Sequence, residues 1–440
     1  MLTVDYVVSG VVLALVCLLV LVERRAVLAP IAAMIFLSAL SPAQDYAGNS
    51  LVTWLFPLQE HRVEGAIVVA VPILVRALAE IGGRAWPRVA GATVILILIA
   101  MYQGMLRVFH QSLGEGIQTA VFGSMVVGSL AICVPTVVRE PGGLRRLLYC
   151  VAAANVAWLA GIGVQLVRDP EPLMLGSRFT GLTSNPQSAG IYLALSCVLV
   201  LWLALHERRG WGRCLAAVVV VADCALLLWT GSRTGVLSLV LGALLSVRGS
   251  SRRALTSAAL LAVPTVVVLH LVQGAGAVAP VERLTSTADS GRIQALQRML
   301  HAGLASPIVG NGIVDANASE NSLLLGFAAF GLGMVALLLA LIYASWRACR
   351  RLKARAAGTR TLRSLADAFL AFYAMCFFIS LFEGVLLARF RESLVLLVLV
   401  NGAVAALLAT PRVAPARGRI VAAGSARRPQ LRGGRHAIAG

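Results

Sequence analysis

The segment QGAGAVAPVERLTSTADSGRIQALQRMLHAGLASPIVGNGIVDANASEN, residues Gln273–Asn321, separates two long apolar runs, Ala254–Val272 and Ser322–Ser345. A membrane-crossing helix needs about 20 mostly apolar residues, with roughly 17 to 25 tolerated. Both runs meet this requirement, so the segment is predicted to be a loop between two spans. Loops of this length are usually functional. Its ionisable residues include Glu282, Arg283, Asp289, Arg292, Arg298, His301, Asp315 and Glu320.

Apolar runs of the same kind recur along the whole chain. The sequence is 59% hydrophobic and 13% charged, with a mean hydropathy of +0.86, whereas a soluble domain carries about 25% charged residues. We therefore expect an all-α polytopic membrane protein with about 12 to 13 transmembrane helices and a long outward-facing loop. Two runs, Ala26–Leu40 and Thr234–Val247, are short enough to be tilted or re-entrant. The predicted spans are Tyr6–Val22, Ala26–Leu40, Val63–Ala79, Val89–Phe109, Ile117–Val138, Leu147–Leu166, Ala189–Leu205, Cys214–Trp229, Thr234–Val247, Ala254–Val272, Ser322–Ser345, Leu365–Leu387 and Leu394–Ala409.

The positions of Lys and Arg predict which side of the membrane each connector faces, because cytoplasmic connectors carry an excess of them. When alternate connectors are grouped, most of the 38 Lys and Arg residues fall on the side that carries the C-terminal tail. We expect a multi-pass protein of the bacterial inner membrane, with its N-terminus outside and its C-terminus cytoplasmic. Residues 1–410 would form the transmembrane domain, with Gln273–Asn321 in the periplasm. Residues 411–440 would form a basic, disordered tail that lies on anionic lipid.

The net charge of +19 would suggest nucleic-acid binding in a soluble protein. Here cytoplasmic arginines account for it, and no basic and aromatic motif accompanies the charge, so no nucleic-acid partner is expected. None of the eight cysteines has a C-x-x-C spacing, which argues against disulfides and a zinc site. No metal or cofactor is expected. The first five residues contain no Lys or Arg, so the first apolar run is expected to remain as a span.

A short outer connector, Thr230-Gly-Ser-Arg-Thr-Gly235, places Arg233 at the edge of the hydrocarbon, beside the start of the next predicted helix. A helix N-terminus and a guanidinium both favour an anion. We therefore expect Arg233 to bind an anionic ligand, with the small residues around it letting that ligand approach. The alternative is that Arg233 reaches lipid headgroups.

A second cluster, Gly176-Ser-Arg-Phe-Thr-Gly181 followed by Asn185-Pro186, precedes the span Ala189–Leu205. Arg178 has no acidic partner closer in sequence than Glu171, which makes it a candidate for ligand binding. Asn-Pro is typical of a helix start, so Asn185 is either a helix cap or a site residue.

The long outer loop supplies the remaining candidates. Arg292 begins an apolar pattern through Leu300 that is typical of an amphipathic helix at the membrane interface. Arg292 either binds a ligand or pairs with Asp289. Glu320 lies at the mouth of the span Ser322–Ser345, where it is either a helix cap or a catalytic carboxylate.

Arginines and a carboxylate at one outward-facing cavity favour one class of chemistry. Arginines can bind a diphosphate through paired hydrogen bonds. A carboxylate in a partly desolvated setting has a raised pKa and can act as a general base. The set suits displacement of a diphosphate-linked sugar by an acceptor hydroxyl.

These motifs occur in a fixed order between Gly176 and Ala344. They are Arg178-Phe-Thr-Gly with Asn185-Pro186, Gly231-Ser-Arg-Thr-Gly, Gly291-Arg292, Pro307 with Gly310-Asn-Gly312, Glu320-Asn-Ser322 and Phe330-Gly-Leu332. The set resembles the O-antigen ligase and polysaccharide polymerase superfamily of multispan glycosyltransferases. The resemblance implies a lipid-diphosphate-linked glycan donor, an outward-facing cavity under a long loop, and inverting transfer without metal. Glu320 stands where the family usually has histidine, which puts a histidine-dependent ligase in doubt and leaves a polymerase with a carboxylate.

By position, Arg233 and Arg292 resemble the family's diphosphate-binding arginines. We expect Arg178 to be a third diphosphate ligand and Glu320 to deprotonate the acceptor hydroxyl. The expected enzyme joins undecaprenyl-diphosphate-linked oligosaccharide repeat units on the periplasmic face, in exopolysaccharide or O-antigen biosynthesis. Its expected partners are the lipid-linked oligosaccharide, membrane lipid, a flippase and chain-length or export proteins. The alternatives are ligase-type transfer of a finished glycan to another acceptor, and a transporter or flippase of lipid-linked sugar. The secondary site candidates are Asn321, Asn185, Asp223, His301, Arg389 and Arg391.

Asp223 lies within the span Cys214–Trp229, roughly 10 Å below Thr230 at 1.5 Å rise per residue. Intramembrane carboxylates are usually functional or paired, and the alternative for Asp223 is a helix–helix hydrogen bond as the protonated acid. A flippase is expected to have charged or polar residues at mid-depth in several of its spans. Asp223 is nearly alone there, which favours chemistry at the outer surface over transport.

Overall fold

The computed structural model describes residues 27–40, 55–81, 89–139, 142–183, 185–246, 292–312, 321–356, 359–387 and 391–410. They belong to one compact unit, Met1–Thr410. Outside the described residues lie the predicted spans Tyr6–Val22 and Ala254–Val272, the site candidates Glu320 and Arg389, and the tail 411–440.

The described chain is mainly helical, which confirms the all-α polytopic class predicted from the sequence. Every predicted span within the described residues overlaps a helix. Eight of the described helices are long and apolar enough to cross a membrane: α5 (Gly91–His110), α6 (Leu113–Arg139), α7 (Gly143–Arg168), α8 (Pro186–His206), α9 (Gly210–Thr230), α14 (Ser322–Arg355), α15 (Arg360–Ser380) and α16 (Glu392–Ala409). The shorter or more charged helices are α2 (Leu28–Ser38), α3 (Phe56–Glu60), α4 (Arg62–Ile81), α10 (Arg233–Ser246) and α13 (Arg292–Ala305). Between α7 and α8 lie a 3-10 turn, η3 (Glu171–Leu173), and two antiparallel strands, β1 (Met174–Leu175) and β2 (Arg178–Phe179).

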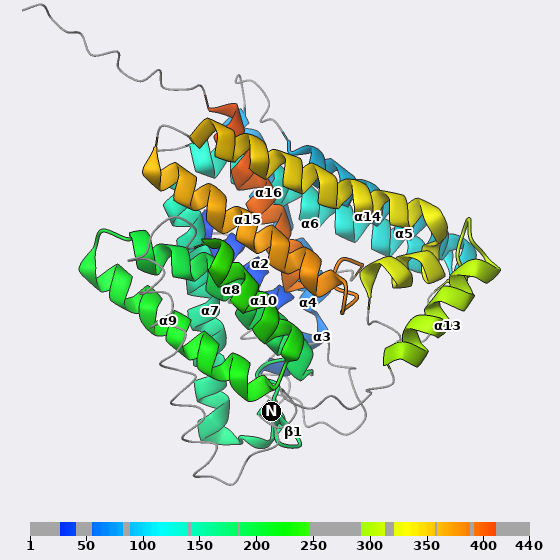
Figure 1. Ribbon diagram of the computed structural model, residues 1–440, viewed down its shortest axis with the longest axis horizontal. Coiled ribbons are helices and arrows are strands. Elements are labelled where there is room, and N and C mark those ends of the chain that lie inside the picture. The colour runs from blue at the N-terminus through cyan, green and yellow to red at the C-terminus, as the bar shows by residue number, and fades with distance from the viewer. Residues whose placement is uncertain are drawn as a thin grey trace, which may run out of the picture. The chain divides into compact units, whose positions relative to one another are not determined.

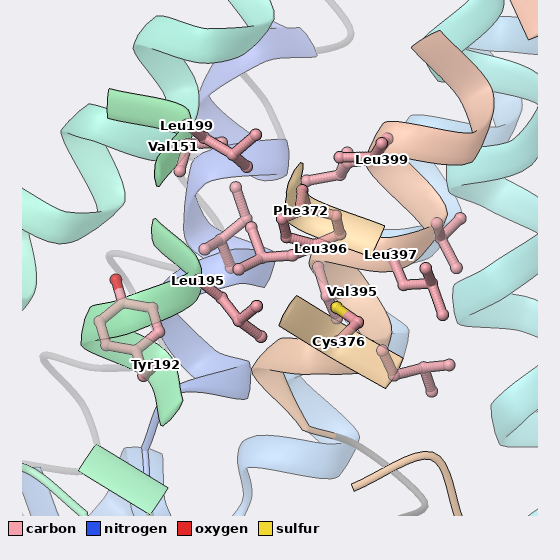
Figure 2. Packing of buried hydrophobic residues seen from close by; sticks show 14 of the residues in the cluster. Val151, Tyr192, Leu195, Leu199, Phe372, Cys376, Val395, Leu396, Leu397 and Leu399 are labelled. Carbon is pink, nitrogen blue, oxygen red and sulfur yellow. The ribbon is translucent and has the colours of Figure 1, made fainter. Parts of the chain in front are cut away.

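Helices α8 and α16 lie at the centre of the bundle. Both are apolar on all sides and nearly all of their side chains are buried, as expected for helices surrounded by other helices. Leu195 and Leu199 of α8 belong to the same buried cluster as Phe372 of α15 and Leu396 of α16 (Figure 2). Around them, α14 and α15 run side by side, with α5 also contacting α14 (Figure 1).

The span predicted over Leu365–Leu387 differs from the structure at both ends. Helix α15 begins at Arg360 and ends at Ser380, and residues 381–387 form turns. The hydroxyl of Ser322 donates to the carbonyl of Glu383 (2.8 Å) and accepts from the N–H of Leu386 (3.3 Å). Hydropathy did not reveal this turn, because a helix and a buried turn can have equally apolar sequences. In the buried turn, another segment supplies the hydrogen-bond partners of the backbone.

The two ends of the bundle differ in character. The end that carries the α8–α9 and α14–α15 connectors, here called the basic end, is rich in arginine and contains ion pairs. Arg145 Nε lies 3.4 Å from Glu207 Oε2, and Lys353 Nζ lies 2.5 Å from Asp367 Oδ1. Burial raises the pKa of Glu207, but hydrogen bonds from the backbone N–H groups of Arg209 and Arg208 and from Tyr149, with the charge of Arg145, bring it below its ordinary value. The opposite end carries the sequence motifs; that it faces outward remains a prediction.

Helix α13 confirms the helix expected after Arg292, but its buried face differs from the predicted apolar pattern. Met299 is fully buried against α14, and Ala295 is also buried. A Cβ on Gly303 would overlap the ring of Phe327, so the glycine permits this close approach of α13 to α14. Ile293 and Leu300 remain exposed.

Helix α14 is broken at Gly331, where φ is 75° and ψ is −170°. A break opens the backbone hydrogen-bond ladder, and the exposed groups need new partners in an apolar environment. The segment 306–312 provides most of them. The N–H groups of Asn311 and Gly312 donate to the carbonyls of Ala328 (2.8 Å) and Ala329 (3.1 Å).

Two further groups at the break also have partners. The N–H of Leu332 donates to Pro307 O (2.8 Å), and the hydroxyl of Tyr102 in α5 donates to Phe330 O (3.2 Å). The motifs Pro307, Gly310-Asn-Gly312 and Phe330-Gly-Leu332 therefore form a single structural unit, in which one segment completes the hydrogen bonding of the other.

We expect Gly331→Ala to lower the melting temperature of the detergent-purified protein. The backbone conformation at Gly331 is adopted almost only by glycine, and such strain costs about 1–3 kcal/mol. A Cβ there would also overlap Ile308 O and displace the segment 306–312. Gly163→Ala in α7 is the matched control, because a Cβ at that exposed helical position meets open space. Equal melting temperatures for the two variants would contradict the role given to Gly331.

Candidate functional site

Arg233 and Arg292 line one cavity of about 220 Å³ at the end of the bundle opposite the basic end. Arg233 is the first residue of α10 and Arg292 the first of α13, and both side chains are half-buried. We call this the arginine cavity. Its other lining residues are Gln187, Gly231, Thr234, Leu237, Phe378 and Phe382. Two positive charges from distant parts of the sequence thus face a space with aromatic and aliphatic walls.

A tight turn between α9 and α10 positions Arg233. Gly231 ends α9 with φ of 59°, a left-handed conformation that suits glycine. The N–H of Ser232 donates to Thr230 Oγ1 (3.1 Å), and the N–H of Gly235 donates to Ser232 Oγ (3.2 Å). These bonds fix the first turn of α10, and with it the starting point of the Arg233 side chain.

Some of the small residues of this motif serve helix packing. A Cβ on Gly235 would lie 2.9 Å from the carbonyl of Gly190, and a Cβ on Gly190 would lie 2.5 Å from Ser232 Cβ. Glycines at these positions let α8 and α10 cross closely. Of the small residues expected to admit a ligand, Gly231 and Thr234 line the cavity.

Gln187 is a lining residue that the sequence did not single out as a site candidate. Ser232 Oγ donates a hydrogen bond of 2.6 Å to Gln187 Oε1. This bond orients the amide so that its Nε2 group remains as a donor, and among the described residues no acceptor for Nε2 is present. Gln187 occupies the first turn of α8 directly after Asn185-Pro186, so its position in a helix start was the available signal.

Glu383 holds Arg292 at the edge of the arginine cavity. Arg292 Nη2 lies 3.4 Å from Glu383 Oε1, and the Glu383 side chain is 13% exposed. The predicted alternative partner, Asp289, lies outside the described residues. Because Glu383 is next to the lining residue Phe382, the turn after α15 contributes both a wall of the cavity and a carboxylate beside it.

The Glu320-Asn-Ser322 motif is joined to this same turn. Asn321 caps α14, since its Oδ1 accepts from the N–H groups of Leu323 (2.9 Å) and Leu324 (3.0 Å). Its Nδ2 donates to Leu381 O (2.9 Å), while the hydroxyl of Ser322 donates to Glu383 O. The start of α14 therefore fixes the turn that lines the arginine cavity. Glu320, the preceding residue, lies outside the described chain.

Arg178 supports the site from behind instead of lining it. Its Nε donates to Thr230 O (2.8 Å), the carbonyl at the end of α9. The next residue, Phe179, stacks on Trp229 with ring centroids 5.5 Å apart, and a Cβ on Gly181 would lie 2.5 Å from the ring of Trp158. The Arg178-Phe-Thr-Gly motif thus braces the turn that carries Arg233.

None of the secondary candidates in the described residues lines the arginine cavity. Asn185 caps α8 by accepting from the N–H of Gln187 (2.8 Å). Asp223 is fully buried and accepts a 2.5 Å hydrogen bond from Asn155 of α7, which is the helix–helix contact given as its alternative. His301 is exposed on α13, and Arg391 immediately precedes α16.

No family model matches this chain. Nor does any curated protein match it. The family resemblance of the motifs and the residue roles that it implies therefore stay predictions. Among the described residues, no three His, Cys, Asp or Glu side chains are grouped so that they could hold a metal ion.

Proposed function

We propose that the protein is a polysaccharide polymerase that joins polyprenyl-diphosphate-linked oligosaccharide repeat units at the outer face of the bacterial inner membrane. The observation that carries this proposal is the convergence of Arg233 and Arg292 on one cavity. The resemblance of the ordered motifs to the O-antigen ligase and polymerase superfamily adds to it.

In this proposal the diphosphate of the donor lipid occupies the arginine cavity. A guanidinium can donate two parallel hydrogen bonds to phosphate oxygens, and such charge-assisted bonds are stronger than neutral ones. Gln187 Nε2 supplies a neutral donor on the third side, with its amide fixed by Ser232. Leu237, Phe378 and Phe382 give the apolar walls that suit the first isoprene units next to the diphosphate.

The reaction is a single displacement at the anomeric carbon of the donor sugar. The acceptor hydroxyl oxygen forms the new bond to that carbon while the bond from the carbon to the diphosphate oxygen breaks. The diphosphate leaves with the electron pair, and its growing negative charge is stabilised by Arg233 and Arg292. Glu320 takes the proton of the acceptor hydroxyl. The configuration at the anomeric carbon is inverted.

The proposal is tested with the purified full-length chain in proteoliposomes that contain lipid-linked repeat units. A polymerase extends the units into a ladder of longer lipid-linked glycans and releases free polyprenyl diphosphate. A ligase makes no ladder from repeat units alone and requires a different acceptor. A flippase moves the repeat units between leaflets without forming any glycosidic bond. If a separate assay shows that the protein is folded, the absence of both a ladder and released polyprenyl diphosphate would contradict the polymerase proposal.

A further inference from the structure

A second cavity, of about 380 Å³, lies at the basic end, between the start of α5, the last part of α14 and the end of α16. We call it the basic-end cavity. Since α14 runs from the Asn321 end of the bundle to the basic end, this cavity is separate from the arginine cavity. Its lining residues include Gly91, Tyr343, Arg347, Arg351 and Leu408.

The charge of the basic-end cavity is wholly positive. Arg347 and Arg351 lie one turn apart on α14, and both side chains line the cavity. No Asp or Glu of the described chain is among the lining residues. Two described acids at the basic end have partners of their own, since Asp367 pairs with Lys353 and Glu207 with Arg145. Two guanidinium groups held one turn apart can bind a phosphate group together.

The walls of the basic-end cavity are formed by small and apolar side chains. Ala344 and Ala348 lie on the same face of α14 as the two arginines, and their short side chains leave the space open. Helix α5 begins here at Gly91 without a side-chain cap, and a Cβ on Gly91 would meet open space. Its first N–H groups add to the positive potential. Tyr343, 55% exposed, and Leu408 supply apolar surface beside the charge.

We infer that the basic-end cavity binds the phosphate group of an anionic membrane phospholipid. Arg347 and Arg351 donate hydrogen bonds to the phosphate oxygens, while the apolar walls contact the glycerol and the upper acyl chain. A membrane lipid fits this combination better than a free phosphate ion does, because a free ion gains nothing from the apolar walls. Basic pockets between transmembrane helices near the cytoplasmic surface are typical sites for lipid headgroups. The inference is independent of the polymerase proposal.

The test compares retention of phosphatidylglycerol and phosphatidylcholine by the purified protein in nanodiscs, measured by native mass spectrometry after mild delipidation. The wild type should retain phosphatidylglycerol in preference to phosphatidylcholine. The double variant Arg347→Gln/Arg351→Gln should bind phosphatidylglycerol at least about 10-fold more weakly, because two charge-assisted hydrogen-bonding groups are lost. Arg350→Gln is the matched control, since Arg350 lies in the same stretch but is stacked 4.8 Å from the ring of Trp346 and does not line the cavity.

A second variant separates the cavity from surface charge. Ala348→Phe fills the space and keeps both arginines, so it should weaken phosphatidylglycerol binding while the charge is unchanged. The inference is overturned by an equal loss in Arg350→Gln, by unchanged binding in Ala348→Phe, or by no preference for phosphatidylglycerol. If millimolar inorganic phosphate displaced phosphatidylglycerol completely, the cavity would be a site for a free phosphate ion, and the inference of a lipid site would be overturned.

Discussion

Arg233→Gln will abolish surface polysaccharide while single lipid-linked repeat units accumulate, at a normal level of the protein in the membrane. The side chain of Arg233 lines the arginine cavity from the first turn of α10. Because hydrogen bonds fix this turn, we expect that no neighbouring side chain can take the place of the guanidinium. Loss of one preorganised donor to a developing negative charge costs roughly 100- to 1,000-fold in rate. The rate should be measured with lipid-linked repeat units in proteoliposomes.

Two further variants give this result its meaning. Arg233→Lys keeps the charge but loses the planar fork of donors, so an intermediate rate is expected. Arg298→Gln is the matched control on α13, because Arg298 is exposed and does not line the cavity, and it should retain the wild-type rate. If Arg233→Gln and Arg298→Gln have the same rate, Arg233 does not bind the donor, and its alternative role at lipid headgroups stands.

The variant Glu320→Gln should lose about 100- to 10,000-fold in the rate of polymerisation, because a positioned general base contributes that much. The amide is similar in size but cannot accept the proton of the acceptor hydroxyl. Binding of the donor lipid should be nearly unchanged, since Arg233 and Arg292 remain. The measurement is single-turnover polymerisation together with binding of the lipid-linked repeat unit.

Glu383→Gln is the decisive comparison, because Glu383 is the carboxylate seen beside Arg292. We expect it to loosen Arg292 and raise the KM for the donor, with a smaller effect on kcat. Glu320→His supplies a base that Glu320→Gln lacks, so activity should return in part. The acidic limb of its pH–rate profile should lie at higher pH than that of the wild type, because imidazole ordinarily loses its proton about 2 pH units above a carboxyl group. A large kcat loss in Glu383→Gln with normal activity in Glu320→Gln would transfer the role of base to Glu383.

The helices could be predicted from the sequence because long apolar runs in a membrane have few alternatives to the helix. The pair Arg233 and Arg292 could be proposed because charge is scarce in the connectors predicted to face outward and each arginine lies beside a helix start. Gln187 was not proposed as a site residue, because a neutral side chain in a helix start is only a weak signal. Its importance depends on Ser232, which is distant in sequence and near only in the folded chain.

The same limit explains why Arg178 was expected at the ligand. The sequence indicated that it lacked an acidic partner nearby, but its described partner is a backbone carbonyl, Thr230 O, which no charge pattern reveals. The small residues of Gly231-Ser-Arg-Thr-Gly were expected to leave room for a ligand; Gly231 and Thr234 line the cavity, whereas Gly235 accommodates the crossing of α8 and α10. Glycine predicts that something approaches closely, but the sequence does not say what.

The break in α14 has a consequence for engineering this protein. Residues 306–312 supply hydrogen bonds that α14 lacks at Gly331, so this part of the long connector is a component of the helix bundle and not a separable cover. A graft that exchanges the connector with that of another membrane protein must therefore carry the paired stretch around Ala328–Leu332 with it. The smallest transferable module is this pair of segments together with α13, because Met299 is buried against α14 and Gly303 permits the close approach of α13 to Phe327.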